Sequence, residues 1–437
     1  MIQRLAESMS EAVKIPTISH ADPTKEDREV FSEFLTFLEN RYPTMYAKLE
    51  IKRFGDSVLY TWRGKEEEGE LFLAHYDVVP HEGQEWTTDP FGGAIEGGFV
   101  HGRGTLDDKG NCILLHEAIE SLLNEGFVPQ KTVYLAIGAD EEVGGRRGAV
   151  EMAKHLKENG AIIHTILDEG GAVTVDAMEG GEKPFALVGL AEKGSTNFLL
   201  SLRGQGGHSS MPPPSTVIGK MATLIQKIEA NPPMPRLTPT VRAMFETMAP
   251  FMGTRGKLLA RIKQLFPVIS KALVKSPTTN SFVRTTFSVT MIDGGNAPNV
   301  LPAKVQAVVN ARILQGDSVE GIMTYLRKHL GDEVEIEVTL HEEPSKTTPH
   351  QTKEFAVLKE AIEHTFGDVV VVPYLMSGGS DARHYQVLSE HIYRFSPVVM
   401  TKEDIASIHS ADEKISLENL EKGFVFFKDY LKQRSMR

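Results

Sequence analysis

Clusters of acidic residues and histidines follow three apolar runs of the sequence. The runs are residues 71–74, 132–138 and 162–167, and the clusters after them are His75-Tyr76-Asp77, Asp140-Glu141-Glu142 and Asp168-Glu169. Each run has the length and composition of a buried strand. In open α/β sheets, ligands bind in the crevice at the carboxyl ends of the strands. We therefore expect the three clusters to converge on one site.

Two further segments carry the same residue types. Residues 102–110 (GRGTLDDKG) precede a predicted helix, and residues 408–413 (IHSADE) follow a connection near the C-terminus. A single acid at a strand end is more often a cap or turn residue than a ligand. Together the five segments supply two histidines and several acids, a donor set that suits zinc, manganese or cobalt. More than four such ligands indicate two metal ions.

The cysteine content supports a metal site of this kind. Cys112 is the only cysteine, which excludes an intrachain disulfide and a multi-cysteine zinc site. It also fits a reducing compartment. Other catalytic patterns are missing from the sequence: there is no GxxxxGK[ST], no GxSxG and no HExxH.

Charge and hydropathy indicate which partners to expect. The chain has 47 basic and 59 acidic residues, a net charge of −12, which disfavours sequence-independent binding to nucleic acid. The longest apolar run, Val369–Met376, is interrupted by Pro373 and is too short to span a bilayer. Residues 1–13 read as an amphipathic helix rather than a signal peptide. We expect a cytoplasmic protein with no nucleic-acid or membrane partner.

The positions of strands and helices predict two domains, since 437 residues exceed one hydrophobic core. Helical spacing at 111–124 and 149–158 separates the first strands, which predicts an α/β fold with a mostly parallel sheet covered by helices. From about residue 187 the pattern is α+β. Strands are predicted at 198–202, 282–292, 305–313 and 334–340, and helices at 217–230 and 318–330.

The α/β pattern then returns near the C-terminus. Helices are predicted at 353–366 and 417–432, and strands at 369–372 and 391–395. The simplest architecture is a discontinuous catalytic domain (1–186 and 341–437) with an inserted α+β lid or dimerisation domain (187–340).

Residues 236–276 allow two interpretations. We expect two helices broken around Gly253, with Met244, Met248 and Met252 among the apolar positions. The segment is either a helical elaboration with a solvated basic face or an adaptable apolar wall over a hydrophobic substrate group, because methionine surfaces repack easily.

Nine motifs occur in order and resemble one enzyme family. They are HYDVVP, WTTDPFGG, GRGTLDDKG, DEEVGG, LDEGG, GHSS, GGNAPNVLPA, GGSDAR and IHSAD. They are similar to the di-zinc aminoacylase/carboxypeptidase family, which includes aminoacylase, carboxypeptidase S and succinyl-diaminopimelate desuccinylase. The resemblance runs from about Ile15 to the end. VGLAEKG, LDEGG and the helical insert are most similar to the carboxypeptidase S branch and its secreted fatty-acyl amino-acid hydrolase relatives.

The resemblance implies a set of ligands for two Zn²⁺ ions, with Co²⁺ or Mn²⁺ as substitutes. His75 and His409 would each be a terminal ligand, Asp107 would bridge the ions, and Glu142 would complete the site shared with His409. The fifth ligand would be Glu169, with Asp168 as the alternative. The family also has a cis peptide after the bridging acid, here between Asp107 and Asp108.

The resemblance also implies catalytic and substrate-binding roles. The residues are Glu141 as general base, Asp77 as hydrogen-bond partner of His75, His208 as oxyanion donor, Arg312 for a substrate carboxylate, and Asn299 and Gly379 as further substrate contacts. In some members the histidine that corresponds to His208 comes from a partner subunit, which makes a homodimer through the inserted domain possible. For Asp77 and Arg312 the plainer alternatives are a strand-end cap and a surface ion pair.

The expected activity is metal-dependent hydrolysis of an amide bond. The substrate would be a small N-acyl amino acid or short peptide with a free carboxylate. One alternative is a dipeptidase or carboxypeptidase that acts on short peptides. The other is a degenerate metal-binding scaffold without activity, which the full set of candidate ligands disfavours.

Overall fold

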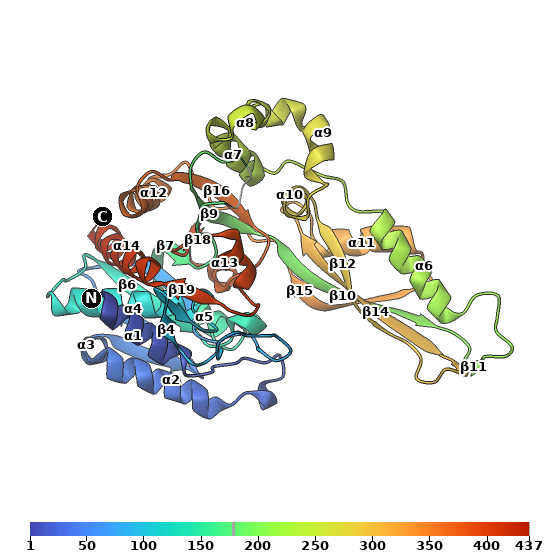
Figure 1. The fold of residues 1–437 in the computed structure, drawn as a ribbon, viewed down its shortest axis with the longest axis horizontal. Helices are drawn as coiled ribbons and strands as arrows, with labels where there is room; N and C mark the ends of the chain where they lie inside the picture. The colour runs from blue at the N-terminus through green and yellow to red at the C-terminus, as the bar shows by residue number, and fades with distance from the viewer. Residues whose placement is uncertain (177–179, 437) are drawn as a thin grey trace.

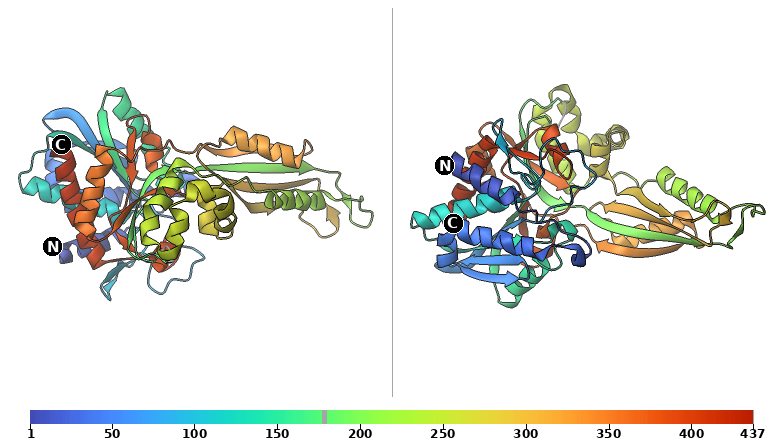
Figure 2. Two further views of the ribbon diagram at one scale, coloured as in Figure 1. Left: turned by 90° about the horizontal axis from the view of Figure 1, so that it is seen from above. Right: turned by 60° about the horizontal axis from the view of Figure 1, so that its bottom comes forward.

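The computed structural model describes residues 1–176 and 180–436, which form a broad α/β body and an elongated arm (Figure 1). The body contains both ends of the described chain. The arm extends from one side of it, as the two further views also show (Figure 2).

A ten-stranded sheet forms the centre of the body, in the order β1-β2-β6-β3-β7-β17-β9-β8-β18, with β16 paired to β9. Its central strands β6, β3, β7 and β17 are parallel, and antiparallel pairs flank them. The α/β fold with a mostly parallel sheet is thus confirmed. The strands are β1 (Glu50–Phe54), β2 (Ser57–Trp62), β3 (Glu66–His75), β6 (Lys131–Gly138), β7 (Ile162–Asp168), β8 (Val173–Thr174), β9 (Phe185–Glu192), β16 (Val370–Met376), β17 (His391–Arg394) and β18 (Val399–Met400).

Helices cover both faces of this sheet because its strands are apolar on both sides. In β3, Phe72 packs in the larger core cluster and Leu71 in the cluster on the opposite face. The larger cluster is shared with α1 (Ile2–Val13), α2 (Arg28–Arg41), α3 (Pro43–Lys48), α4 (Lys109–Asn124), α12 (Lys353–Phe366) and α14 (Leu417–Met436). On the opposite face lies α5 (Ala149–Glu158). The helices at 149–158 and 353–366 have the predicted bounds, and the amphipathic N-terminal helix begins one residue later than predicted, at Ile2.

A four-stranded antiparallel sheet forms the arm, in the order β12-β14-β10-β15. We call this sheet, its two helices and the short pair at its end the lid. Its elements are β10 (Gly194–Arg203), β12 (Thr286–Asp293), β14 (Lys304–Ile313), β15 (Glu335–Glu342), α6 (Val217–Ala230), α11 (Val319–Leu330), and the pair β11 (Gly207–His208) and β13 (Val300–Leu301). Both helices pack on one face in a separate core cluster.

The chain passes from the large sheet to the lid sheet, and back, a few residues after the predicted domain boundaries. Residue 187 lies inside β9, a strand of the large sheet, and the lid sheet begins at Gly194 after the buried Lys193. Residues 340 and 341 lie inside β15 of the lid sheet. β9 is buried along almost its whole length, as a strand inside the large sheet is, whereas β14 and β15 of the lid alternate between more and less buried residues.

The helical segment 239–283 packs on the body rather than on the lid. It comprises α7 (Pro239–Met248), the short 3₁₀ turn η3 (Ala249–Phe251), α8 (Gly253–Leu259), α9 (Ile262–Leu273) and α10 (Pro277–Val283). Figure 1 shows α7, α8 and α9 above β9 and β16. Met244, Met248 and Met252 are buried in a core cluster with residues of these two strands.

Two predictions for this part of the chain were wrong in detail. Residues 236–276 hold three α-helices rather than two, because the chain breaks at Ala260 and Arg261 as well as at Gly253, whose φ is +51°. The predicted strand 282–292 is split: its first two residues end α10, which begins with Pro277 at a position where proline favours helix, and β12 starts only at Thr286.

The remaining elements lie around the body. They are the three-stranded sheet of β4 (Ile95–Glu96), β5 (Phe99–His101) and β19 (Lys414–Ser416), the helix α13 (Lys402–Ser407), and the 3₁₀ turns η1 (Pro23–Lys25), η2 (Glu141–Val143) and η4 (Asp381–Tyr385). Among the described residues, no helix is both long and apolar enough to cross a bilayer.

Candidate metal centre

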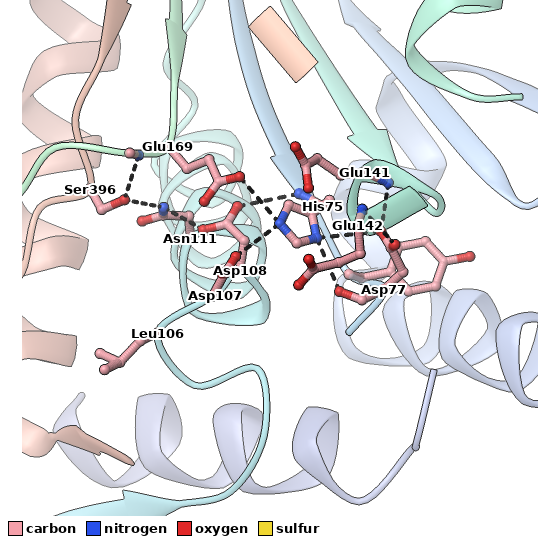
Figure 3. A network of polar contacts seen from close by, with 12 residues as sticks. His75, Asp77, Leu106, Asp107, Asp108, Asn111, Glu141, Glu142, Glu169 and Ser396 are labelled. Carbon is pink, nitrogen blue, oxygen red and sulfur yellow. Dashed lines mark hydrogen bonds and ion pairs between the residues drawn. The ribbon is translucent and has the colours of Figure 1, made fainter. Parts of the chain in front are cut away.

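Three adjacent parallel strands bring the predicted site together at one edge of the large sheet. β6, β3 and β7 are neighbours, and their carboxyl ends lead into Glu141 and Glu142, into His75 and Asp77, and into Glu169, respectively. The continuous apolar run of each strand gives way to charged residues at this edge. Figure 3 shows these side chains pointing toward one another.

Asp107 lies between two histidines. Its Oδ1 is 3.1 Å from Nε2 of His75, and its Oδ2 is 2.9 Å from Nε2 of His409. The carboxylate thus presents one oxygen to each ring. Asp107 directly precedes Asp108, the N-cap residue of α4, and the peptide bond between them is cis, as predicted.

Two groups of potential ligands share this carboxylate. His75, Asp107 and Glu169 form one group, and Asp107, Glu142 and His409 form the other; within each group the ligand atoms lie within 4.8 Å of one another. Nε2 of His75 is 3.3 Å from Oε1 of Glu169, and Nε2 of His409 is 3.1 Å from Oε1 of Glu142. Two imidazoles and three carboxylates, one of them shared, are a donor set that fits two divalent cations of the zinc class.

Burial and the charge of Asp107 raise the pKa values of the two glutamates of this cluster. Burial, followed by the charge of Asp107, raises the pKa of Glu169 to about 8 and that of Glu142 to about 7. Hydrogen bonds to Asp107 and Glu142 raise the pKa of His409 to about 10. A divalent cation supplies the positive charge that lets such carboxylates stay ionised, so the electrostatics also favour a metal centre.

Asp77 connects the two halves of the site. Nδ1 of His75 is 3.0 Å from the main-chain carbonyl of Asp77 and 3.3 Å from its Oδ1. The same carboxylate accepts hydrogen bonds from the main-chain N–H groups of Glu141 and Glu142 and from Oγ of Ser19. This completely buried acid therefore fixes the ring of His75 and the turn that carries the two glutamates.

Of the two candidates for the fifth ligand, only Glu169 has its carboxylate among the potential ligand atoms. Asp168 accepts hydrogen bonds from the main-chain N–H groups of Glu169 and Ala382, at 2.9 and 2.7 Å. It is 3 % exposed. Its oxygens are thus occupied by the backbone.

Glu141 faces the same cavity as the candidate ligands but belongs to neither ligand group. Burial raises the pKa of its carboxyl group well above the ordinary value. Among the described residues, no donor hydrogen-bonds to this carboxylate, whereas its main-chain N–H is held by Asp77. A carboxylate of this kind, beside a metal centre and with a raised pKa, suits a general base.

The cavity has a volume of about 730 Å³ and lies between the body and the lid. Ser195, Arg312 and Glu342 contribute to it from the lid strands. Its apolar lining residues include Leu106, Leu340, Tyr374, Met376, Met400, Ile405 and Ile408. None of the described residues of α7–α10 lines it, so their methionines do not form the hydrophobic substrate wall that we considered.

Two arginines of this cavity differ in their pairing. Arg383 forms ion pairs with Glu342 and Glu192, at 3.6 Å from Oε2 of the latter. Arg312 has no ion pair with any described residue, and burial followed by the charge of Arg383 lowers its pKa. A largely buried guanidinium without a counter-ion can bind an anionic group that enters the cavity.

Gly379 lies against Arg383. A Cβ atom at this position would be 1.2 Å from Nη2 of Arg383, so only glycine lets the guanidinium pass. Gly379 also lines the cavity.

The structure does not bring His208 or Asn299 to this cavity. His208 lies in β11, which pairs with β13 at the far end of the lid (Figure 1). Its side chain is exposed, and its Nδ1 is 2.8 Å from Oγ of Ser210. The main-chain carbonyl of Asn299 accepts a hydrogen bond from Ser209 at the same end. The two residues are thus neighbours of each other and remote from the metal centre.

Sequence reasoning missed several residues that line the cavity. Arg383 lies in the GGSDAR motif but received no role, although the motif itself was the available signal. Ser195 and Glu342 come from lid strands, where no motif marks them. Asp381, another missed residue, is buried, and burial raises its pKa well above the ordinary value.

Comparison with known proteins gives one consistent family. A model described as "Peptidase family M20/M25/M40" matches residues 71–433. The probable carboxypeptidase S-like 2 of Dictyostelium discoideum is 35 % identical over 98 % of this chain and 84 % of its own length. The N-fatty-acyl-amino acid synthase/hydrolase PM20D1 of Xenopus tropicalis is 34 % identical over 96 % of this chain and 83 % of its own.

A solved structure has the same overall fold. The M20 family metallo-carboxypeptidase Sso-CP2 from Sulfolobus solfataricus matches with a TM-score of 0.73 and 19 % sequence identity, over 99 % of each chain. At this low sequence identity, the match shows only that the two chains share a fold.

Proposed function

The chain belongs to peptidase family M20/M25/M40 and is a metal-dependent hydrolase, and we propose that it cleaves the amide bond of small N-acyl amino acids or short peptides that carry a free carboxylate. The observation that carries this proposal is the position of Arg312. An unpaired, largely buried guanidinium lines the same cavity as the two groups of potential ligands.

The proposed metal ions are two Zn²⁺, held by His75, Asp107, Glu142, Glu169 and His409, with Co²⁺ or Mn²⁺ as substitutes. When bound, such a pair makes water nucleophilic near neutral pH and polarises the scissile carbonyl. The donor types, the shared carboxylate and the mutual distances of the ligand atoms support this assignment.

Glu141 is the proposed general base. Its carboxylate takes a proton from the attacking water and later passes it to the nitrogen of the leaving amine. Its raised pKa supports both steps, because a carboxyl group that titrates nearer neutrality can accept the proton and give it up again. Asp77 positions the turn that carries Glu141 through the hydrogen bond to its main-chain N–H.

The cavity supports a substrate with one anionic and one apolar end. Arg312 is the proposed partner of the substrate carboxylate. Met376, Met400 and Ile405, on elements of the body, offer apolar surface to an acyl group or a hydrophobic side chain. The PM20D1 relative is named for N-fatty-acyl-amino acids, which have these two ends. The N-acyl amino acid is therefore our first choice, and a hydrophobic dipeptide is the alternative.

We further propose that the protein acts as a homodimer through the lid, with His208 of one copy serving the cavity of the other. The proposal rests on the exposed position of His208 at the end of the lid, away from the cavity of its own chain. In the cavity of the other copy, His208 would donate a hydrogen bond to the developing oxyanion. Cytoplasmic location likewise stays a proposal, based on the single cysteine.

Hydrolysis by metal-loaded protein tests the proposed function. Protein loaded with Zn²⁺ or Co²⁺ should release the amino acid from a panel of N-acyl amino acids and dipeptides. Glu141→Gln should keep both ions and lose at least about 10²-fold in kcat, because the proton acceptor is gone. Turnover unchanged in this variant would overturn the role of Glu141. Fewer than one ion per chain together with no hydrolysis would favour the non-catalytic scaffold.

Relative rates within the panel distinguish the two substrate classes. The proposal requires a higher kcat/KM for N-acyl amino acids with long apolar acyl groups than for short polar dipeptides. The reverse order would assign the chain to the dipeptidases.

A further inference from the structure

One stretch of the helical segment has a charge opposite to that of the whole chain. Residues 253–276 contain six lysines and arginines and no acid, in a chain with a net charge of −12. All six are exposed: Arg255, Lys257, Arg261, Lys263, Lys271 and Lys275. Among the described residues, Glu182 lies beside Gly253 at the beginning of α8, so we consider only the end of α8 and α9, whose own sequence carries no acid.

The inner face of this stretch is fixed to the body. Leu259 and Ile262 are buried in the core cluster that includes residues of β9 and β16, and Phe266, Ile269 and Leu273 pack partly buried against the same cluster. The two helices also pack on each other. The apolar positions needed to hold α8 and α9 in place are thus already in use.

Further apolar side chains remain on the outer side. Leu258 is 55 % exposed and Val268 is 71 % exposed. Lys257 precedes Leu258, and Lys271 follows Val268 by three residues, which puts it on the same side of α9. Neither lysine forms an ion pair with a described residue, and neither does Lys275. The outer surface therefore combines protruding aliphatic groups with lysines that have no counter-ion.

We propose that the outer surface of α8 and α9 docks on the anionic surface of a lipid bilayer. Helices that lie in a membrane interface have an apolar side for the acyl boundary and lysines or arginines for the headgroups. Each basic residue near an anionic bilayer contributes about a fivefold increase in partitioning. The acids elsewhere in the chain oppose this weakly, because charges separated by more than about 10 Å are screened at physiological salt.

The exposed aliphatic side chains favour lipid over a polyanion such as nucleic acid. A polyanion would contact the lysines alone and would leave Leu258 and Val268 in water. A bilayer takes up both kinds of group. The proposal departs from our expectation of no membrane partner, which came from the length of the apolar runs, because docking on a surface needs no spanning helix.

Vesicle co-sedimentation of the full, metal-loaded protein tests the charge requirement. The protein should bind phosphatidylcholine vesicles that contain about one third phosphatidylserine, should not bind pure phosphatidylcholine, and should be released by high salt. The triple variant Lys257→Glu/Lys271→Glu/Lys275→Glu should lower partitioning by at least about 100-fold. The matched variant Lys25→Glu/Lys65→Glu/Lys154→Glu changes the net charge equally at exposed positions elsewhere and should bind within about threefold of wild type.

A second pair of variants tests the apolar requirement. Leu258→Ser/Val268→Ser should weaken vesicle binding by about tenfold or more, whereas Val128→Ser, at a valine that is 58 % exposed on the body, should not. Binding of the double variant at the wild-type level, or displacement of the protein from vesicles by equimolar single-stranded DNA, would overturn the proposal in favour of a polyanion site. No binding of wild type to anionic vesicles would also overturn it. The measurement uses no substrate, so its result is independent of the proposed reaction.

Discussion

Asp168 and Glu169 are adjacent in the chain, yet their carboxylates serve different partners. Asp168 accepts two main-chain hydrogen bonds, one of them from Ala382 at 2.7 Å, while Oε1 of Glu169 lies 3.3 Å from Nε2 of His75. The first carboxylate therefore holds the backbone of the η4 turn against β7, and the second reaches the candidate metal centre. The two acids should respond differently to the same loss of charge.

Glu169→Gln should reduce the metal content of the protein to about one ion per chain, because an amide oxygen is a far weaker ligand than a carboxylate. Asp168→Asn should keep both ions and instead lower the free energy of unfolding by about 1–3 kcal/mol, since one of its oxygens becomes an NH₂ group that faces a main-chain donor. Metal analysis and chemical denaturation of both variants check this. Loss of an ion in Asp168→Asn but not in Glu169→Gln would reverse the assignment.

His208→Ala should lower kcat by about 10²- to 10³-fold with little change in metal content. The reason is the loss of one donor to the oxyanion, which contributes about 3–4 kcal/mol in comparable sites. If His208 serves the cavity of a second copy, mixing His208→Ala with Glu141→Gln should restore activity, because mixed dimers contain one site with both residues intact. The measurement compares the rates of each variant alone with the rate of the mixture after subunit exchange, and it shows whether His208 acts in the cavity of a second copy. A mixture no more active than its parts would mean that His208 acts within its own chain or not at all.

Arg312→Lys should lower kcat/KM by about 10- to 100-fold for substrates with a free carboxylate, because lysine cannot form the bidentate pair that a guanidinium forms. The effect should be mainly on KM and should vanish for the carboxamide form of the same substrate. Arg242→Lys is a suitable control, since Arg242 forms an ion pair with Glu246 on α7 outside the cavity. Equal losses for the acid and the carboxamide would contradict a role in carboxylate recognition.

The strands that carry the candidate ligands could be predicted because each combines two local signals. In the stretch before His75, an apolar run of strand length ends in charged residues, and parallel pairing then brings such ends to one edge. The same reasoning could not decide between Asp168 and Glu169. The choice depends on the main-chain N–H of Ala382, which is more than 200 residues away in the chain.

The lid contribution to the cavity could not be predicted for a different reason. The burial of β15 alternates regularly, so nothing in its sequence tells which half-exposed residue faces the body rather than solvent. Glu342 reaches the cavity only because the lid sheet stands against η4, where it meets Arg383. The methionines of α7 gave a false indication of a substrate wall, because a buried core and an adaptable pocket use the same residue type.

His116 should make the protein less stable as the pH falls below neutrality. Its ring is completely buried in α4 between Tyr42 and Tyr60, and its Nδ1 faces the main-chain carbonyl of Cys112 at 2.7 Å. Its Nε2 has no hydrogen-bond partner among the residues that the structure describes. Burial lowers the pKa of this ring from 6.5 to about 4. Between these two values the unfolded chain binds a proton that the folded protein does not. The free energy of unfolding therefore decreases as the pH falls, by about 2 kcal/mol between pH 7 and pH 5.

His116→Phe keeps a flat ring against the two tyrosines and removes the titrating group. Chemical denaturation at pH 7 and at pH 5 should show a smaller difference in the variant than in wild type, by about 2 kcal/mol. Other groups titrate equally in both proteins, so the comparison isolates His116. His364→Phe, at an exposed position of α12, should retain the wild-type difference. If wild type and His116→Phe lose the same stability between the two pH values, the ring of His116 must take up its proton in the folded protein as readily as in the unfolded chain.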